Sequence, residues 1–453
     1  MQTATDSKME CVLGIDVGTS RVKCALVNTA GLSILQESSV DLGELQTSSV
    51  TGASERSVAG IQSSLESCLD KFDTALLTSV RAIAVCGQMH GCLLWSSTNE
   101  QTPSNLITCQ DGRCDTNFLS SLPQTRQPVA ISSGYGCATL AWLQRHCPEQ
   151  LKGYDCAGTI MDYVVWALVG DDDRGVLMMS NQNAAGWGYF DQANMSWETD
   201  LLAESGFPVH LLPRVVSVPA IAGRLKSSWH GIAGGVLVGV ALGDMQCSVL
   251  AAQPNTTDAV LNIGTSSQLV AIKSTPLDHL PTSVLKVPYF SQQTLIVAAS
   301  LSGGNVVKTF VSTLRSWLGE LGLPCPIEEE IYARLMTRAQ DHMTTTLRVD
   351  VRLWGERHTP NQRGGLENVA EDNASIGDVA SALFRGIVEN LHSMMTAKVL
   401  QELKVTRLLG SGTSLEKNDV LRKHTENVFG LPLIIKPGVG SPLGAAKAAI
   451  LLY

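Results

Sequence analysis

Short apolar runs near the start of the chain alternate with stretches of helical periodicity. Residues 11–17, CVLGIDV, and 22–28, VKCALVN, are apolar runs on either side of a turn that contains Gly18, so they predict a β-hairpin. Apolar residues at three- or four-residue spacing predict a helix over 58–72, and the run RAIAVC at 81–86 predicts another strand. Strands that alternate with helices indicate an α/β layered fold.

The same hairpin pattern returns in the second half of the chain. The apolar run AVLNI at 259–263 leads into the turn GTSS at 264–267, and a second apolar run, QLVAI, follows. Because strand, Gly-Thr-Ser turn and strand occur twice, we expect two related lobes that each open with a hairpin. We place the boundary before the glycine-rich strand GGVLVGVALG at 234–243, which predicts lobes over 1–233 and 234–453.

The last hundred residues contain the other periodic segments. A helical stripe of apolar residues spans 379–395, and an apolar strand is predicted over 405–409. A glycine-rich turn, GSGTS at 410–414, follows that strand, and a further helix is predicted over about 417–428. Residues 359–376 are polar and predict a long loop.

Composition supports a folded protein and excludes some partners. Hydrophobic residues make up 44% of the 453 residues and charged residues only 17%, a balance that disordered chains do not have. The formal net charge of −9 argues against partners such as nucleic acids and anionic membranes, whose phosphates require a basic face. We therefore expect neither kind of partner.

Targeting signals and paired cysteines are missing from the sequence. The first residues, MQTATDSKMECVLG, lack a basic region followed by an apolar core, and no apolar stretch approaches membrane-spanning length. The 12 cysteines are scattered and include no Cys-x-x-Cys pair, a usage typical of reduced thiols. We expect a cytoplasmic protein.

Several familiar catalytic and nucleotide-binding motifs do not occur. The sequence has no GxxxxGK[ST], no HExxH and no GxSxG, so it supports neither a P-loop, a zinc protease nor a serine hydrolase. Gly438, Gly440 and Gly444 resemble a dinucleotide-binding fingerprint, but the spacing is one residue too long. We expect these glycines to open a closely packed helix instead.

The turn of the first hairpin is a candidate phosphate site. Asp16 stands at a strand end, Gly18 allows close approach of a ligand to the backbone, and Thr19 and Ser20 add hydroxyl donors. Backbone N–H groups of such a turn can hold phosphate oxygens, Lys23 can add charge, and the carboxylate can hold Mg²⁺, usually through water. The alternative is an ordinary hairpin with a turn aspartate.

Two further glycine-rich turns strengthen this interpretation. Gly264 and Thr265 repeat the first turn, and Gly410 and Gly412 lie in a turn whose exposed backbone suits a flat adenine or ribose. Three such turns favour a nucleotide-binding protein.

Asp244 is the candidate catalytic base. It ends a glycine-rich apolar strand at the predicted lobe boundary, where ligands bind in α/β folds. A carboxylate there can take the proton from a hydroxyl that attacks a γ-phosphate. The alternative is a helix cap for the following segment, MQCSVLAA.

Two segments offer groups for a polyol. Gln88 and His90, in GQMHG at 87–91, carry donors and acceptors, and a structural histidine is the alternative. Asp111 and Arg113, in CQDGRC, pair a carboxylate with a guanidinium, although a surface turn also accounts for them.

Taken in order, these motifs resemble the FGGY family of carbohydrate kinases. The matching segments are GIDVGTS at 14–20, GQMHG at 87–91, GD at 243–244, NIGTS at 262–266, LWGER at 353–357, GSGTS at 410–414 and SPLGAA at 441–446. The resemblance spans nearly the whole chain. It implies an α/β fold of two actin-like, ribonuclease-H-like lobes, with ATP and a sugar in the cleft between them.

The resemblance also implies roles for individual residues. Asp16 would assist the Mg²⁺–phosphate assembly, with Asp244 as the base. The phosphate contacts would come from Gly18, Thr19, Ser20, Lys23, Gly264 and Thr265; the adenosine contacts from Gly410, Gly412 and Asn418; and the sugar contacts from Gln88, Met89, His90, Asp111 and Asp244.

The form of the sugar motif narrows the expected substrate. GQMHG favours ketoses over glycerol, and the segments at 107–114, 159–170 and 180–191 resemble members that phosphorylate sedoheptulose on its 7-hydroxyl. A xylulose or other pentulose kinase is the nearest alternative. Two positions depart from relatives: Cys109 stands where many have Trp, and Asn181 stands where some have an acidic residue.

Two alternatives come from other functional classes. One is a catalytically silent, actin-like regulatory protein that binds nucleotide or sugar, and the other is an ATPase that acts on protein. Intact Asp16 and Asp244 argue against the first, and GQMHG has no evident purpose in the second. We expect ATP and a small-molecule sugar as ligands, Mg²⁺ as cofactor, and a monomer or homodimer.

Overall fold

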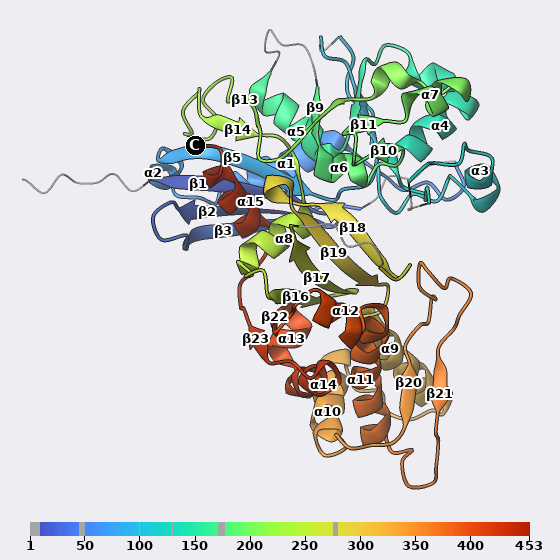
Figure 1. The fold of residues 1–453 in the computed structure, drawn as a ribbon. Helices are drawn as coiled ribbons and strands as arrows, with labels where there is room; N and C mark the ends of the chain where they lie inside the picture. Colours follow the sequence, from blue (N-terminus) through green and yellow to red (C-terminus); the bar gives the residue numbers. More distant parts are fainter. Residues whose placement is uncertain (1–9, 45–49, 99, 128–129, 171–176, 275–279) are drawn as a thin grey trace, which may run out of the picture. The chain divides into compact units, whose positions relative to one another are not determined.

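The chain forms two compact units, which we call unit 1 and unit 2 (Figure 1). The computed structural model describes residues 10–44, 50–98, 100–127, 130–170, 177–274 and 280–453. Unit 1 contains the described residues up to Ala251, together with Pro288–Gln292 and Gly440–Tyr453, and unit 2 contains the remainder.

A mixed sheet forms the centre of unit 1. Its strand order is β13-β14-β5-β1-β2-β3, and β15 also pairs with β5. The strands are β1 (Cys11–Val17), β2 (Arg21–Asn28), β3 (Ile34–Asp41), β5 (Val80–Gly87), β13 (Ile221–Arg224), β14 (Leu237–Gly239) and β15 (Leu242–Gly243). Strand β1 runs antiparallel to β2 and parallel to β5, so the predicted first hairpin and the predicted third strand are confirmed.

Successive side chains of β1 point to opposite faces of this sheet. Leu13 and Ile15 enter the main hydrophobic core, to which helices α1 (Val58–Leu69) and α5 (Ile160–Val169) also contribute. Because successive side chains point to opposite faces, Gly14 and Asp16 face the C-terminal helix α15 (Ser441–Ile450) instead. In Figure 1 this helix, drawn in dark red, lies against the blue strands.

A second hydrophobic cluster of unit 1 surrounds Trp187 and Tyr189, which are both almost fully buried. The helices near it are α4 (Gly136–His146), α6 (Asn181–Ala185) and α7 (Thr199–Glu204). The short strands of unit 1 are β4 (Glu55–Arg56), β6 (Leu93–Trp95), β7 (Leu106–Ile107), β8 (Cys156–Gly158), β9 (Met178–Ser180), β10 (Phe190–Asp191), β11 (Ser196–Trp197) and β12 (Arg214–Val216). Its remaining helices are α2 (Thr74–Leu77), α3 (Thr116–Ser120) and α8 (Asp244–Ala252), and its 3₁₀ turns are η1 (Pro148–Leu151), η2 (Val209–Leu211) and η3 (Phe290–Gln292).

Five strands of the unit 2 sheet, β19-β17-β16-β22-β23, repeat the order β3-β2-β1-β5-β14 of unit 1. The full strand order of the unit 2 sheet is β18-β19-β17-β16-β22-β23, in which β16 runs antiparallel to β17 and parallel to β22. The strands are β16 (Asp258–Ile263), β17 (Ser267–Lys273), β18 (Val284–Pro288), β19 (Thr294–Ser300), β20 (Arg348–Asp350), β21 (Gly365–Glu367), β22 (Arg407–Ser411) and β23 (Leu433–Ile435). The helices are α9 (Gly304–Glu320), α10 (Glu328–Gln340), α11 (Ile376–Met394), α12 (Ala397–Glu402), α13 (Thr413–Lys417) and α14 (Asp419–Phe429). The second predicted hairpin is therefore also confirmed.

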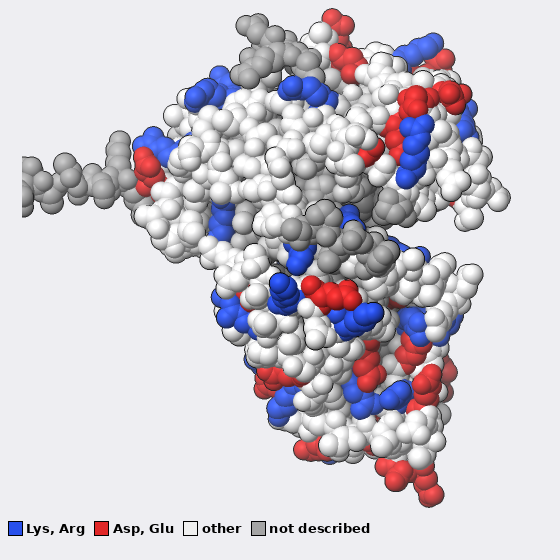
Figure 2. All heavy atoms as spheres, viewed as in Figure 1, with Lys and Arg blue, Asp and Glu red and all other residues white. Residues whose placement is uncertain are grey.

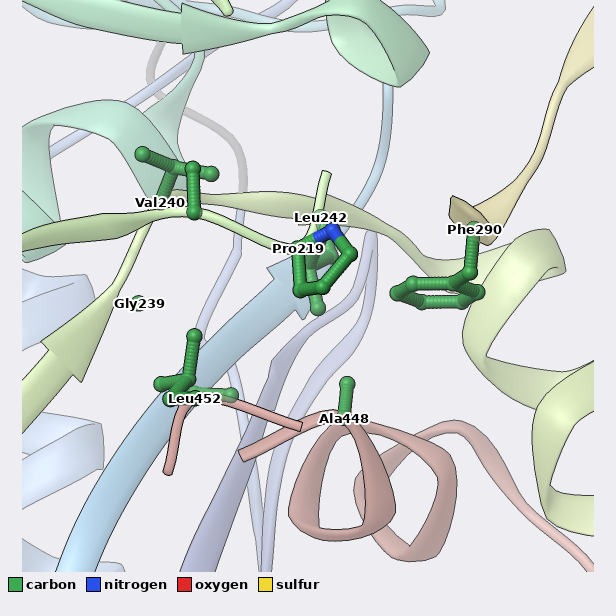
Figure 3. Close-up of a pocket in the computed structure, with 9 residues that line it drawn as sticks. Pro219, Gly239, Val240, Leu242, Phe290, Ala448 and Leu452 are labelled. Atoms are coloured by element: carbon green, nitrogen blue, oxygen red, sulfur yellow. The ribbon is translucent and has the colours of Figure 1, made fainter. Parts of the chain in front are cut away.

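The two later segments of unit 1 border a small cavity together with earlier residues of the same unit. Phe290 and residues of the C-terminal end, among them Ala448 and Leu452, line a cavity with Pro219 and Leu242 (Figure 3). Its volume of about 10 Å³ is near the lower limit for one water molecule, and its labelled side chains are apolar. The cavity is a packing gap and not a substrate pocket.

Several predicted boundaries differ from the structure. The segment predicted as one strand over 234–243 forms two short strands, β14 and β15. The strand is interrupted at Val240, whose N–H donates to the Ala220 carbonyl. Both short strands pair with β5, so the division falls after Ala251 and not before residue 234. The predicted loop over 359–376 contains β21, which pairs with β20.

Other predicted elements are present with shifted ends. The first helix ends at Leu69 instead of residue 72, and the strand predicted over 405–409 continues to Ser411. The helix predicted over about 417–428 is α14, and the shorter α13 precedes it.

The surface carries charges of both signs. On the face drawn in Figure 2, Lys and Arg side chains lie singly or in small groups among Asp and Glu, and most of the coloured surface is uncharged. Among the described residues, no helix is long and apolar enough to cross a membrane.

Candidate active site

The first glycine turn joins β1 to β2 beside a buried carboxylate. Gly18 donates its N–H to the Arg21 carbonyl at 3.0 Å, which closes the turn. Thr19 is half-buried and Ser20 is exposed. Asp16, the last residue but one of β1, is only 3% exposed. The predicted turn thus presents backbone and hydroxyl groups beside one carboxylate.

Two groups hold the Asp16 carboxylate. Ser441, at the first position of α15, donates its hydroxyl to Asp16 Oδ2 at 2.6 Å. Lys23, the register partner of Asp16 on β2, places its Nζ 3.5 Å from the same oxygen. Burial raises the pKa of Asp16, whereas Ser441 and Lys23 lower it.

Asp244 follows directly from a strand that pairs with β5. Gly243 on β15 lies opposite Gly87 on β5, so Asp244 and Gln88 leave the sheet at the same edge. Asp244 is half-buried, and its Oδ1 accepts the Met245 N–H at 2.7 Å. It lies in unit 1, not in the second predicted lobe, because β15 belongs to the sheet of unit 1.

The Asp244 carboxyl has a strongly shifted pKa. Burial raises it to about 7, and the negative charge of Asp16 contributes to the increase. The Met245 N–H and the Lys23 charge oppose the increase. A carboxylate with a pKa near neutrality can accept a proton and release it again at physiological pH.

Gln88 and Met89 lie beside the strand that ends at Asp244. Gln88 is 5% exposed, and neither Oε1 nor Nε2 has a hydrogen-bond partner among the residues that the structure describes. The Met89 sulfur lies 2.7 Å from where a Cβ on Gly243 would stand, so this position accepts only glycine without a shift. An unpartnered buried amide is costly, and a polar ligand would satisfy it.

His90 has a defined orientation. Its Nδ1 lies 2.6 Å from the Gly186 carbonyl, and its ring stacks on Tyr135 with centroids 4.7 Å apart. Because a carbonyl only accepts, Nδ1 carries the proton, and in the neutral ring Nε2 is an acceptor.

Asp111 differs from the other predicted sugar ligands in its partners. Its oxygens accept from the Ser54 N–H at 2.8 Å, the Arg113 N–H at 3.0 Å, and Arg113 Nε and Nη2 at 2.8 and 2.9 Å. A carboxylate has about four lone-pair sites, and these donors occupy them. Both Asp111 and Arg113 are buried, so the pair is not an exposed surface turn.

The second glycine turn, in unit 2, is held by the start of α9. Gly304 donates its N–H to the Gly264 carbonyl at 2.8 Å, and Asn305 donates its N–H to the Thr265 carbonyl at 3.1 Å. Thr265 itself is exposed. The turn therefore has a fixed backbone with an accessible hydroxyl residue.

The third glycine turn follows β22. Gly412 has φ of +97°, and a Cβ there would meet Asn262 Oδ1 at 2.6 Å, so both conformation and space require glycine. A Cβ at Gly410 would meet leucine and isoleucine side chains at 2.9 Å. Asn418 caps α14 by accepting the Leu421 N–H at 3.0 Å. These contacts show structural roles for the three residues, and their adenosine contacts stay a prediction.

The residues near Asp16 fit Mg²⁺ held largely by substrate phosphates. Among the residues that the structure describes, only the Cys86 thiol, 4.0 Å away, donates to Asp16 Oδ1. Carboxylate oxygen is a ligand that Mg²⁺ prefers. Within the described residues, no cluster of three His, Cys, Asp or Glu side chains could hold a metal ion alone. Mg²⁺ commonly binds through one or two carboxylates, waters and phosphates.

Sequence reasoning missed two residues that support these carboxylates. Ser441 lies far along the chain from Asp16, and its signal was the motif SPLGAA, to which no role was assigned. Gln182 is fully buried and accepts the Gly243 N–H through Oε1 at 3.2 Å. Nothing in the local pattern around Gln182 points to Gly243.

Comparison with known proteins decides the family. The model of the FGGY family of carbohydrate kinases, N-terminal domain, matches residues 11–251, which is more than half of the chain. The chain belongs to the FGGY family of carbohydrate kinases. It is a sugar kinase, and this family membership implies ATP and a small-molecule sugar as substrates.

Two relatives resemble this carbohydrate kinase over almost its whole length. Sedoheptulokinase from Mus musculus is 40% identical over 460 residues, and that from Homo sapiens is 41% identical over 470 residues. Each alignment covers 96% of this chain and 96% of the relative.

Solved structures confirm the fold class of this carbohydrate kinase. Xylulose kinase from Rhodospirillum rubrum has a TM-score of 0.81 at 18% identity and covers 98% of this chain and 90% of its own. Gluconate kinase from Lactobacillus acidophilus has a TM-score of 0.79 at 20% identity, with 97% and 89% covered. The expected α/β fold of actin-like, ribonuclease-H-like units is therefore correct.

The two departures from relatives both lie in unit 1. Cys109 is half-buried, and its sulfur lies 3.9 Å from Thr19 Oγ1, so it neighbours the first glycine turn. Asn181 begins α6 and is buried, and its Oδ1 has no hydrogen-bond partner in the described part of the chain.

Proposed function

We propose that this carbohydrate kinase transfers the γ-phosphate of ATP to a ketose, with sedoheptulose as the substrate and its 7-hydroxyl as the acceptor. The observation that carries the proposal is the pairing of β15 with β5, which sets Asp244 beside the buried Gln88, whose amide has no partner among the described residues. A base next to an unsatisfied amide suits a substrate with many hydroxyl groups. The full-length similarity to two sedoheptulokinases supports the choice of sugar.

Asp244 acts as the general base in this proposal. Its carboxylate accepts the proton of the terminal hydroxyl while the hydroxyl oxygen attacks the γ-phosphorus. The bond between that phosphorus and the bridging oxygen breaks, and the bridging oxygen leaves with ADP. A pKa of about 7 keeps a large fraction of Asp244 ionised at neutral pH.

The glycine turns position the phosphates. We assign phosphate contacts to Gly18, Thr19, Ser20 and Lys23 in unit 1 and to Gly264 and Thr265 in unit 2. Adenosine contacts are assigned to Gly410, Gly412 and Asn418. Mg²⁺, when bound, neutralises charge on the transferring group, and Asp16 would hold it through water.

The sugar contacts fall into two groups. Gln88, Met89 and His90 contact the ketose, and the contact of Nδ1 with the Gly186 carbonyl fixes the orientation of the His90 ring. Asp111 has both oxygens occupied by protein donors, so its effect on the sugar is through the shape of the loop that it holds.

The test is ADP release with Mg-ATP across sedoheptulose, xylulose, ribulose, glycerol and no sugar. We expect the highest kcat/KM with sedoheptulose, and a product whose phosphorus couples to the C7 protons by NMR. A preference for xylulose would keep the mechanism and overturn the substrate. No stimulation by any sugar, from folded protein that binds ATP, would favour a silent regulatory protein.

A further inference from the structure

Glu356, in the motif LWGER, is a buried carboxylate that the mechanism above does not use. It is 1% exposed. Its Oε1 accepts from the Ser300 hydroxyl at 2.6 Å and from Asn390 Nδ2 at 2.7 Å, and its Oε2 accepts the Leu301 N–H at 2.9 Å. In the described part of the chain, no lysine or arginine forms an ion pair with it.

Stability alone does not account for a carboxylate at this place. Removing a charge from water is expensive, and replacing buried ionic groups with apolar ones is often neutral or stabilising. Three donors reduce the desolvation cost of the Glu356 carboxylate, and they also hold it in one position. Through these hydrogen bonds Glu356 connects the end of β19, α11 and the loop that leads to α9.

The segment 300–305, which contains this loop and the adjoining ends of β19 and α9, lies against the second glycine turn. A Cβ on Gly303 would lie 2.6 Å from the Ser266 carbonyl carbon, so loop and turn are in direct backbone contact. The hydrogen bonds between them run from Ser267 Oγ to Ser302 O at 2.7 Å, from Gly304 N to Gly264 O at 2.8 Å, and from Asn305 N to Thr265 O at 3.1 Å.

We propose that Glu356 is a positioning residue for the glycine turn at 264–266. It fixes Ser300 and Leu301, and through the loop it holds the turn in the form that receives the phosphates of ATP. The reception of phosphates rests on the proposed function, in which Gly264 and Thr265 contact them. The support of the turn by the loop rests on their hydrogen bonds and backbone contact alone.

The first test measures backbone hydrogen exchange in the full chain without nucleotide. Glu356→Gln places an amide N–H₂ against donors that need an acceptor, which weakens the hold on the loop. Backbone hydrogen exchange over residues 264–266 and 301–305 should therefore become about tenfold faster or more. The matched control is Asp258→Asn. Asp258 is also 1% exposed, and it pairs with Arg407 at the opposite end of β16 from the turn. We expect no change at 264–266 in that variant.

The second test measures the Kd of ATP and the KM of the sugar. Glu356→Gln should weaken ATP binding about tenfold or more with little change in the KM of the sugar, and Asp258→Asn should leave both unchanged. Ser300→Ala keeps the carboxylate but removes one donor, so it should give a smaller change of the same kind. It carries the test if Glu356→Gln does not fold.

The outcomes separate this proposal from the proposed function. Unchanged exchange at 264–266, or equal effects of Glu356→Gln and Asp258→Asn, would overturn the positioning role. If the wild type bound no nucleotide, the proposed function would fail while the exchange result still decided the role of Glu356 toward the turn.

Discussion

Gly87 and Gly243 face each other on the parallel strands β5 and β15. The residues that follow them, Gln88 and Asp244, therefore leave neighbouring strand ends. Asp16 lies on the next strand, where it pairs with Cys86. One edge of a single sheet thus supplies the proposed base, a polyol-binding amide and the carboxylate assigned to Mg²⁺.

Replacement of Asp244 by Asn should abolish most of the activity. The amide cannot take the proton of the attacking hydroxyl, so we expect kcat to fall by a factor of about 10²–10⁴ while ATP still binds. Steady-state kinetics and ATP titration measure the two quantities. Asp200→Asn, at an exposed ion pair with Arg126, is the control and should have near wild-type kcat. Near wild-type kcat in Asp244→Asn would remove that residue from the role of base.

The pH profile should report the Asp244 carboxyl. Only the ionised form is a base, so kcat/KM should fall as the pH falls through about 7. The Lys23 charge lowers the pKa of both Asp16 and Asp244, so Lys23→Met should move this limb to higher pH.

Lys23→Arg is the matched control for the pH profile, because it keeps the charge. In Lys23→Arg the pH at which kcat/KM falls should stay near that of the wild type, even if weaker phosphate contacts reduce kcat/KM at every pH. If kcat/KM of Lys23→Met fell at a lower pH than that of the wild type, the assignment of this fall to the Asp244 carboxyl would be contradicted.

The sequence predicted the parts of the fold that depend on local pattern. Both hairpins, with Gly18 and Gly264 in their turns, follow from apolar runs broken by glycine, and the structure has them at those places. Gly444 was predicted to open a closely packed helix, and it does lie in α15 against α8.

Contacts between distant segments could not be predicted from local pattern. Ser441 reaches Asp16 from the other end of the chain, and Pro288–Gln292 returns to unit 1 after β18. Asp111 is a predicted sugar ligand whose pairing with Arg113 follows from the local motif, but its second partner, the Ser54 N–H, comes from a distant segment. In each case the partner is chosen by packing in the folded chain and leaves no periodic signal.

Gln182 should affect catalysis through the position of Asp244. Its Oε1 holds the Gly243 N–H, so Gln182→Met removes the anchor just before the base. We expect kcat to fall about tenfold, which corresponds to the loss of one buried hydrogen bond, with the KM of ATP unchanged. Thr425→Val is the control, since Thr425 is equally buried and its hydroxyl donates to the Leu421 carbonyl at 2.8 Å in unit 2. Equal loss of kcat in the two variants would indicate general destabilisation.

Asn418 has a capping role that can be separated from nucleotide binding. Asn418→Ala removes the acceptor for the Leu421 N–H, so the free energy of unfolding should fall by about 1 kcal/mol. Asn418→Asp keeps a good N-cap and should retain stability. If Asn418 also contacts adenosine, Asn418→Asp will weaken ATP binding at unchanged stability. Unchanged ATP affinity in that variant would restrict Asn418 to the cap.

Gly444 should be among the least replaceable positions of unit 1. A Cβ there would lie 1.7 Å from the Cys247 carbonyl oxygen, and because that atom is backbone, α15 and α8 would have to move apart. We expect Gly444→Ala to lower the free energy of unfolding by about 3 kcal/mol or more, in the range of severe overpacking. Gly319→Ala is the control, because Gly319 lies in α9 with no atom within 4 Å of an added Cβ. That variant should be neutral or more stable by up to about 1 kcal/mol, since alanine favours the helix. Denaturant unfolding measures both, and equal stability of the two variants would show that α15 does not pack against α8 as described.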